Sequence, residues 1–161
     1  MNIFAVSKDT KECAKCLDDV RLNKMIIETG QLLSTATRQW NEPEQSKVYK
    51  ERQPNHPVNI WVRNSLGNFG WTFALFSSLI QERRFRTGRE HKSEELLVPF
   101  LNVVVRHGCL VHSPGEFQNS SYYKHLPVHQ AYRETLLYKW LYEDKKPPTW
   151  IRRGPPDWYE G

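Results

Sequence analysis

Polar residues recur every three or four positions through an otherwise apolar stretch near the N-terminus. They are Arg21, Lys24, Glu28, Gln31, Thr35 and Arg38. This spacing places side chains on one face of an α-helix. The positions between them are largely leucine, isoleucine and methionine, too many for a helix that only rests on a surface. The pattern predicts a buried helix, begun by Asp18 or Asp19 and ended near Trp40, whose polar face opens onto a pocket.

The simpler interpretation of this stripe is a solvated helix face. An ion pair between Lys24 and Glu28, one turn apart, would then stabilise the helix by only about 0.3–0.5 kcal/mol. If the face lines a pocket instead, burial would perturb the proton affinities of both side chains, which is typical of catalytic groups. The apolar flanks favour the pocket.

A second apolar stretch, from Ile60 to Ile80, is apolar on nearly every side. It contains Trp61, Phe69, Trp71, Phe73, Phe76 and Leu79. A helix of this composition is expected at the centre of the fold. Asn55 or His56 suits its N-terminal cap. Gly67 and Gly70 favour a bend or the close approach of another helix.

Weaker signals predict three further helices and a basic tail. The expected helices run from Thr10 to about Leu17, from Ser93 through Val104, and from Gln130 to Tyr142, and Gly88 is a natural C-terminal cap. Residues 2–6 are β-prone and predict one short strand or an extended segment packed against helices. The composition of residues 108–127 is that of a long loop. We therefore expect a mainly α, single-domain helical bundle over residues 1–161, with a basic, aromatic tail from about residue 145.

Composition favours an anionic partner. The 161 residues carry 23 Lys and Arg against 18 Asp and Glu, a net charge of +5, and six Trp. Positive charge favours nucleic acid or a phosphorylated nucleotide, and aromatic side chains serve both as core and as stacking platforms for bases. No membrane-spanning run or signal peptide is evident, so we expect a cytoplasmic protein without a membrane partner. Its oligomeric state is left open.

The three cysteines allow a zinc hypothesis. Cys13 and Cys16 have the spacing of a zinc-binding pair, with Cys109 and either His107 or His112 as further ligands. The second half of this set lacks the usual spacing. We therefore favour reduced cysteines, and expect no metal and no cofactor.

Several polar residues lie within aromatic surroundings, where polar groups must be paired or face a cavity. His56, Arg63, Asn68 and Glu82 are of this kind. A helix cap accounts for His56 equally well. The guanidinium of Arg63 requires an anionic partner, which is Glu28, Glu82 or an external phosphate.

Two basic segments are candidate phosphate-binding edges. Residues 82–92 contain four Arg, one Lys and one His, among them Arg86, His91 and Lys92. Residues 145–153 interleave cations with Trp150, a composition suited to phosphate contacts and base stacking. Cations at a helix C-terminus and solvated basic tails are the simpler interpretations.

These residues together carry a resemblance to a known family. The run from Lys24 to Ala36, followed by Asn55-His56-Pro57, Trp61-Val62-Arg63, Asn68, Trp71 and residues 88–92, resembles a widespread family of small uncharacterised tailed-phage proteins. The resemblance spans nearly the whole chain. It implies a phage protein acting in the host bacterial cytoplasm, and it does not name a reaction.

A looser resemblance is to the pyrimidine-dimer DNA glycosylases of the phage endonuclease V type. Those are small, basic, helical proteins with an Arg and a Glu on the first long helix and an aromatic, basic tail, roles that Arg21, Glu28 and the tail around Trp150 would fill. The resemblance implies that a free N-terminal amine attacks the sugar while a Glu assists. Because Asn2 is bulky, Met1 is expected to be retained and to supply this amine. Lys24 is the alternative, if it is buried.

Two hypotheses from different classes follow. In the first, a DNA glycosylase/lyase uses Glu28, Lys24, Met1 and Arg21 as its catalytic set. In the second, a phage anti-defence protein binds, sequesters or degrades a small, for example cyclic, nucleotide that acts as an immune signal. The candidate phosphate- and base-binding residues are Gln31, His56, Trp61, Arg63, Asn68, Trp71, Arg86, His91, Lys92 and Trp150. We favour the nucleic-acid-processing enzyme.

Overall fold

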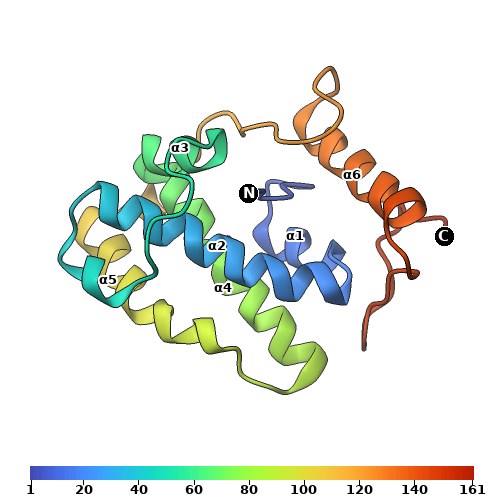
Figure 1. The fold of residues 1–161 in the computed structure, drawn as a ribbon, viewed down its shortest axis with the longest axis horizontal. Coiled ribbons are helices and arrows are strands. Elements are labelled where there is room, and N and C mark those ends of the chain that lie inside the picture. Colours follow the sequence, from blue (N-terminus) through green and yellow to red (C-terminus); the bar gives the residue numbers. More distant parts are fainter.

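Six α-helices and no β-strand make up the fold in a computed structural model that describes all of residues 1–161 (Figure 1). The α-helices are α1 (Thr10–Cys16), α2 (Asp19–Gln39), α3 (Pro57–Asn64), α4 (Leu66–Thr87), α5 (Leu97–His107) and α6 (Val128–Tyr138). Short 3-10 turns, η1 (Pro43–Lys47), η2 (Lys92–Leu96) and η3 (Cys109–Val111), and a π-helical turn, η4 (Lys139–Glu143), complete it. The mainly α prediction is confirmed. No helix has the length and apolar character needed to cross a membrane.

Helices α2 and α4 form the centre of the molecule. They pack along each other, and in Figure 1 α2 crosses in front of α4. Ile26 and Leu32 of α2 and Phe69 and Phe76 of α4 are completely buried. Each such side chain contributes roughly 1.5–3 kcal/mol when it is removed from water. The central apolar helix predicted from the sequence is therefore α4.

One helix was predicted from Ile60 to Ile80, and this prediction is wrong. The stretch consists of the adjoining parts of two helices, α3 and α4. Ser65 separates them with an extended backbone, φ −151° and ψ 156°. Its hydroxyl accepts a hydrogen bond from the N–H of Asn68 at 3.0 Å and so caps α4. The apolar pattern alone does not show this break, because both helices are buried.

Side chains cap the N-termini of three helices, and two of these caps, Asp18 and His56, were predicted from the sequence. Asp9 caps α1, Asp18 caps α2 and His56 caps α3, each by accepting a backbone N–H. Gly88 ends α4 with a φ of +65°, a conformation that favours glycine. These caps fix the direction in which each helix enters the core.

Gly67 and Gly70 admit the chain that follows α5. A Cβ atom on Gly67 would overlap the carbonyl oxygen of Ser113, and one on Gly70 would lie 2.6 Å from the carbonyl oxygen of Cys109. The close approach expected at these glycines is therefore real, although a loop approaches rather than a helix.

Residues 2–6 form the extended segment, and the alternative of a short strand is wrong. Ile3, Phe4, Ala5 and Val6 are buried. No second strand pairs with them. Instead, side chains of α6 bond their carbonyl groups: His129 donates to Ala5 at 2.5 Å and Arg133 to Val6 at 3.0 Å. The N-terminus is thereby enclosed by helices, near the middle of the molecule in Figure 1.

The C-terminal tail is docked over the start of α2 and the end of α4. The backbone N–H of Asp19 donates to the carbonyl of Thr149 at 2.9 Å. The buried carboxylate of Glu82 accepts from Arg153 at 2.6 Å and 3.1 Å. Trp150, Trp158 and Tyr159 of the tail form an aromatic cluster with Trp140 of η4. The tail is part of the fold rather than a solvated end.

Candidate active site

The N-terminal residue and the polar face of α2 line two adjoining cavities. The first, here the Met1 cavity, has a volume of about 190 Å³ and is lined by Met1, Asn2, Phe4, Arg21, Lys24, Met25, Glu28 and Lys139. The second, here the Arg52 cavity, has a volume of about 220 Å³ and is lined by Met1, Lys24, Ile27, Glu28, Gln31, Arg52 and Gln53. Met1, Lys24 and Glu28 belong to both. The N-terminal residue, a lysine and a glutamate therefore line both cavities.

The N-terminus is held by its own second residue. The side-chain oxygen of Asn2 accepts hydrogen bonds from the backbone N–H groups of Ile3, at 2.8 Å, and Phe4, at 2.9 Å. Phe4 adopts a φ of +40°, which costs a non-glycine residue about 1–3 kcal/mol. Burial of residues 3–6 sustains this turn. The sequence analysis did not identify Asn2 as a positioning residue.

Glu28 is shielded whereas Lys24 is not. The side chain of Glu28 is 17% exposed and that of Lys24 is 70% exposed, and their charged atoms lie 3.8 Å apart. The burial on which a catalytic role for Lys24 depends is therefore absent. Of the two residues considered, Met1 is half-buried and Lys24 is exposed.

Arg21 serves the architecture of the site. Its guanidinium donates to Asp144 at 2.7 Å and 2.9 Å and to Asp18 at 3.1 Å. Burial opposes the charge, but the two carboxylates outweigh it and raise the pKa of Arg21. Arg21 is thus permanently charged and fully paired, and it links α2 to the end of η4.

His56 lines neither cavity, but the charges of the N-terminal amine and of Glu28 both act on its pKa. Its Nδ1 accepts the N–H of Val58 at 3.2 Å. Burial lowers the pKa of His56, the positive N-terminal amine lowers it further, and Glu28 opposes both. Because Nδ1 is an acceptor, the neutral ring carries its proton on Nε2.

The C-terminal half of the polar stripe fixes the chain that forms the far wall of the Arg52 cavity. Thr35 accepts the backbone N–H of Arg52 at 3.2 Å, and Arg38 donates to the carbonyl of Tyr49 at 2.6 Å. The amide of Asn59 donates to the carbonyl groups of Arg52, at 2.9 Å, and Gln53, at 2.8 Å. The place of Arg52 and Gln53 in the site was not predicted from the sequence.

The predicted base-stacking tryptophans lie in an internal aromatic cluster. Trp61 and Trp71 pack edge to face, and both pack against Phe117. Their indole N–H groups donate to backbone carbonyls, Trp61 to Glu116 at 2.7 Å and Trp71 to Lys8 at 2.9 Å. Neither lines the Met1 or Arg52 cavity, because the 115–117 loop and the N-terminal chain cover their rings.

The other buried candidates are likewise engaged within the protein. The amide of Asn68 bonds the carbonyl of Trp61 at 2.7 Å and the N–H of Gly115 at 2.8 Å. Arg63 donates to the carbonyl of Pro54 rather than to Glu28, Glu82 or a phosphate, which corrects the expectation of an anionic partner. The indole of Trp150 donates to the carbonyl of Cys16 at 3.1 Å.

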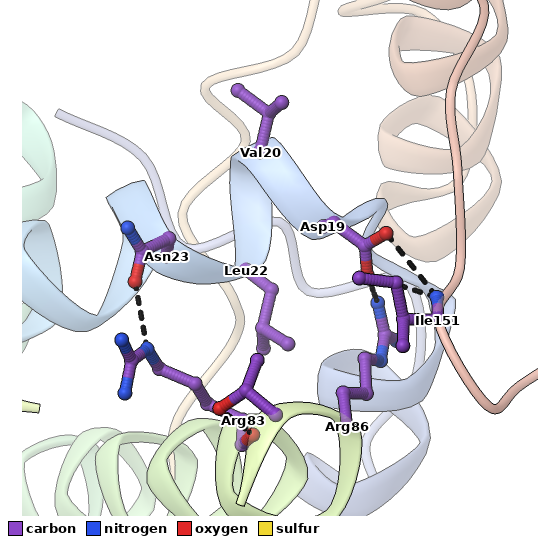
Figure 2. A pocket seen from close by; sticks show the side chains of 8 residues that line it. Asp19, Val20, Leu22, Asn23, Arg83, Arg86 and Ile151 are labelled. Carbon is purple, nitrogen blue, oxygen red and sulfur yellow. Dashed lines mark hydrogen bonds and ion pairs between the residues drawn. The ribbon is translucent and has the colours of Figure 1, made fainter. Parts of the chain in front are cut away.

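Arg86 is the centre of an ion-pair network at the wall of a different cavity, of about 390 Å³ (Figure 2). Its side chain is 1% exposed. It donates to Glu82 at 2.9 Å, to Asp19 at 3.0 Å, and to the carbonyls of Leu17 and Lys15 at 2.9 Å and 3.0 Å. With four donors satisfied internally, Arg86 joins α4 to α1 and α2 and does not face a phosphate.

His91 and Lys92 lie at η2, away from both cavities. His91 caps η2 through its Nδ1, which accepts the N–H of Ser93 at 3.0 Å, and Lys92 is exposed. The cysteines do not converge either. Cys13, Cys16 and Cys109 are buried and free, and no group of three or more His, Cys, Asp or Glu side chains is arranged to hold a metal ion.

The fold and the site define a small, basic, helical protein whose N-terminal residue and a shielded glutamate share a cavity. The chain belongs to the pyrimidine dimer DNA glycosylase family, which matches residues 1–96. The matched region contains all the residues that line the two cavities except Lys139. No curated protein and no solved structure matches the chain.

Membership of this family confirms the looser of the two resemblances and implies a glycosylase-like role in DNA repair with DNA as the substrate. The resemblance to tailed-phage proteins is not tested by it and stays a prediction.

Proposed function

We propose that this protein is a DNA glycosylase and lyase that releases a damaged pyrimidine through an imine with the α-amine of Met1, assisted by Glu28. The observation that carries the proposal is the presence of Met1 and Glu28 in the walls of both adjoining cavities. An amine nucleophile beside a carboxylate is the arrangement that covalent catalysis at a sugar carbon requires. The family match supports the substrate class.

The chemistry assigned to the amine is a displacement at C1′ of the deoxyribose. The nitrogen lone pair forms a bond to C1′ while the bond between C1′ and the base nitrogen breaks. The bonding electrons leave with the base, which takes up a proton. The amine then loses a proton, and the bond between C1′ and the ring oxygen O4′ breaks. O4′ takes up a proton, and a protonated imine remains between Met1 and C1′. The carboxylate of Glu28 stabilises the positive charge that develops at the sugar and receives the proton that the amine releases.

The enclosure of the two amines favours Met1 over Lys24. Asn2 and Phe4 fix the chain at the N-terminus within the Met1 cavity. The Lys24 side chain is 70% exposed and is free to adopt many rotamers. We assign Lys24 to phosphate binding instead.

The remaining residues of the site bind and position. Gln31 contributes a side-chain amide to the wall of the Arg52 cavity. His56 supports α3 through Nδ1 and retains an Nε2–H donor. Arg21 is a positioning residue, because its guanidinium is occupied by Asp18 and Asp144.

A pocket for a small nucleotide is less well supported. That hypothesis draws on Arg63, Arg86, Trp61 and Trp71 as phosphate and base ligands. These four side chains are engaged in internal hydrogen bonds and aromatic packing. None of them lines the Met1 cavity or the Arg52 cavity.

Borohydride trapping tests the proposal. Ultraviolet-irradiated duplex DNA is incubated with the protein and borohydride, which reduces the imine to a stable amine. We expect a covalent adduct with irradiated but not undamaged duplex, and peptide mass spectrometry should place it on Met1. A variant with Gly-Ser inserted before Met1 shifts the amine out of the cavity and should form no adduct.

The control is Lys24→Met, which removes the other amine and should still form the adduct. An adduct on Lys24 would overturn the assignment of the amine. No adduct and no base release with irradiated DNA, from protein whose intact mass shows a free Met1, would overturn the glycosylase.

A further inference from the structure

A third cavity adjoins the Met1 cavity near the start of α2. It has a volume of about 410 Å³ and is lined by Asp18, Val20, Arg21, Lys24, Asp144, Lys145, Lys146, Pro147, Pro148 and Thr149. We call it the Lys145 cavity. It shares Arg21 and Lys24 with the Met1 cavity, which in turn adjoins the Arg52 cavity. Three cavities thus follow one another along α2, and we call them together the trench.

The trench is long relative to one nucleotide. Its walls use α2 from its N-cap Asp18 to Gln31, 13 residues later. At 1.5 Å per residue this is about 20 Å of helix, the axial length of roughly six base-pair steps at 3.4 Å each. A mononucleotide or dinucleotide would leave most of this length empty.

Unpaired cations stand at both ends of the trench. Lys145 and Lys146 are exposed at one end and Arg52 at the other, and none of the three forms a salt bridge. Between them, Arg21 is neutralised by Asp18 and Asp144. The positive charge is therefore spread along the trench. A single phosphate group would instead require the cations to be gathered at one point.

The lysines are presented by an anchored segment. Asp144 bonds Arg21 on one side, and on the other the hydroxyl of Thr149 donates to Asp19 at 2.7 Å. Between these anchors, Pro147 and Pro148 restrict the backbone. Lys145 and Lys146 also lie outside residues 1–96, so the family match does not assign them a role.

We propose that one strand of the DNA substrate lies along α2 through all three cavities. Lys145 and Lys146 hold phosphates on one side of the reacting sugar, and Arg52 holds a phosphate on the other side. Lys24 and Glu28 flank the sugar between them. This inference rests on the proposed function for its choice of substrate, and it identifies the substrate as a polymer.

Salt dependence of DNA binding tests the path. The probe is a duplex with a tetrahydrofuran abasic site, whose C1′ carries no leaving group and cannot form an imine. Each lost phosphate contact reduces the slope of log K against log salt by about 0.9. Between 50 and 200 mM salt, wild-type affinity should therefore fall about 12-fold more than that of Lys145→Gln/Lys146→Gln, and about 3.5-fold more than that of Arg52→Gln.

Matched controls neutralise cations elsewhere. Lys8→Gln/Lys11→Gln removes two exposed lysines around the start of α1, and Arg89→Gln removes one exposed arginine beyond α4. Both controls should keep the wild-type slope. Equal slopes in the trench variants and their controls would overturn the path.

Duplexes shortened on one flank assign the two ends. When the flank held by the lysines is removed, Lys145→Gln/Lys146→Gln should lose no further affinity relative to wild type, while Arg52→Gln still does. Variants that respond identically to both truncations would overturn the proposal.

Failure of the two proposals is distinguishable. If wild-type protein forms the adduct and the trench variants keep the wild-type salt slope, the glycosylase proposal is supported and the strand path is contradicted. If the trench variants have reduced slopes and no adduct forms, the strand path is supported and the glycosylase proposal is contradicted.

Discussion

Arg21 and Asp144 are joined by two hydrogen bonds, of 2.7 Å and 2.9 Å, although 123 residues separate them along the chain. This pair lies where the Met1 and Lys145 cavities meet. It also fixes the end of η4 against the start of α2. One ion pair thereby links the Met1 cavity to the segment that carries Lys145 and Lys146.

Replacement of Arg21 by alanine should destabilise the fold. The side chain of Asp18, 3% exposed, would be left as a buried carboxylate without its cation. Breaking a buried pair in this way costs about 3–5 kcal/mol, and the lower end is expected because Asp144 is 28% exposed. Urea unfolding measures the change. Asp144→Asn should cost less, and a loss under 1 kcal/mol for Arg21→Ala would contradict the role assigned to the pair.

Two histidine caps should make the stability depend on pH. The Nδ1 atoms of His56 and His91 accept backbone N–H groups, and protonation removes these acceptors. Burial lowers the pKa of each, helped by the N-terminal charge at His56 and by Arg83 at His91. Because both pKa values are lower when the protein is folded, the unfolded chain binds protons first as the pH falls. The free energy of unfolding should therefore be level between about pH 7 and pH 8 and decrease below about pH 6.5.

Urea unfolding at pH 7.5 and pH 5.5 checks this dependence. The pKa values of Glu44, Glu94 and Glu143 are lowered by hydrogen bonds from their cationic partners, so these carboxylates lose their contribution only near and below about pH 4.5 and do not obscure the histidine range. The variant His56→Asn/His91→Asn retains capping side chains and should flatten the pH dependence. His125→Asn, at an exposed histidine that caps no helix, should not; equal dependence in both variants speaks against the caps.

Glycine substitutions should distinguish the stability cost of a close contact from that of an unfavourable backbone conformation. Gly67→Ala forces its Cβ into the backbone of Ser113 and should destabilise by about 1–3 kcal/mol or more. Gly88→Ala meets no neighbour but keeps a φ of +65°, at a cost of about 1–2 kcal/mol. Gly154→Ala has neither constraint and should change the stability by less than about 0.5 kcal/mol. Thermal and urea unfolding give the order, and a neutral Gly67→Ala would contradict the packing of the loop.

The parts of the fold that the sequence predicted depend on local chemistry. Asp18 and His56 cap helices wherever a free N–H lies two or three residues ahead, and Gly88 ends a helix because of its own backbone freedom. The stripe on α2 was visible for the same reason, since helical spacing needs no tertiary information.

The site was only partly predictable because its walls are assembled over long distances. Glu28 and Met1 were identified, but Arg52 enters the site through a bond to Thr35, and Lys139 arrives from the end of α6. For Arg63, the sequence indicates the need for a partner and not its nature. A backbone carbonyl serves it as an anion would.

Glu28→Gln should separate fold from catalysis. The substitution keeps the shape of the side chain and removes its charge. The ion pair that is lost is weak, because it is 3.8 Å long and its partner Lys24 is 70% exposed. The free energy of unfolding should therefore change by less than about 1 kcal/mol. Single-turnover cleavage of the glycosidic bond in irradiated duplex, followed as strand scission at the damaged sugar, should fall roughly 10²–10⁴-fold, the usual contribution of a general acid–base group. Binding to the tetrahydrofuran duplex should be retained or strengthened, because the carboxylate repels phosphate. Strand scission at the wild-type rate by a folded Glu28→Gln variant would remove Glu28 from the catalytic set and leave the amine of Met1 to act without it.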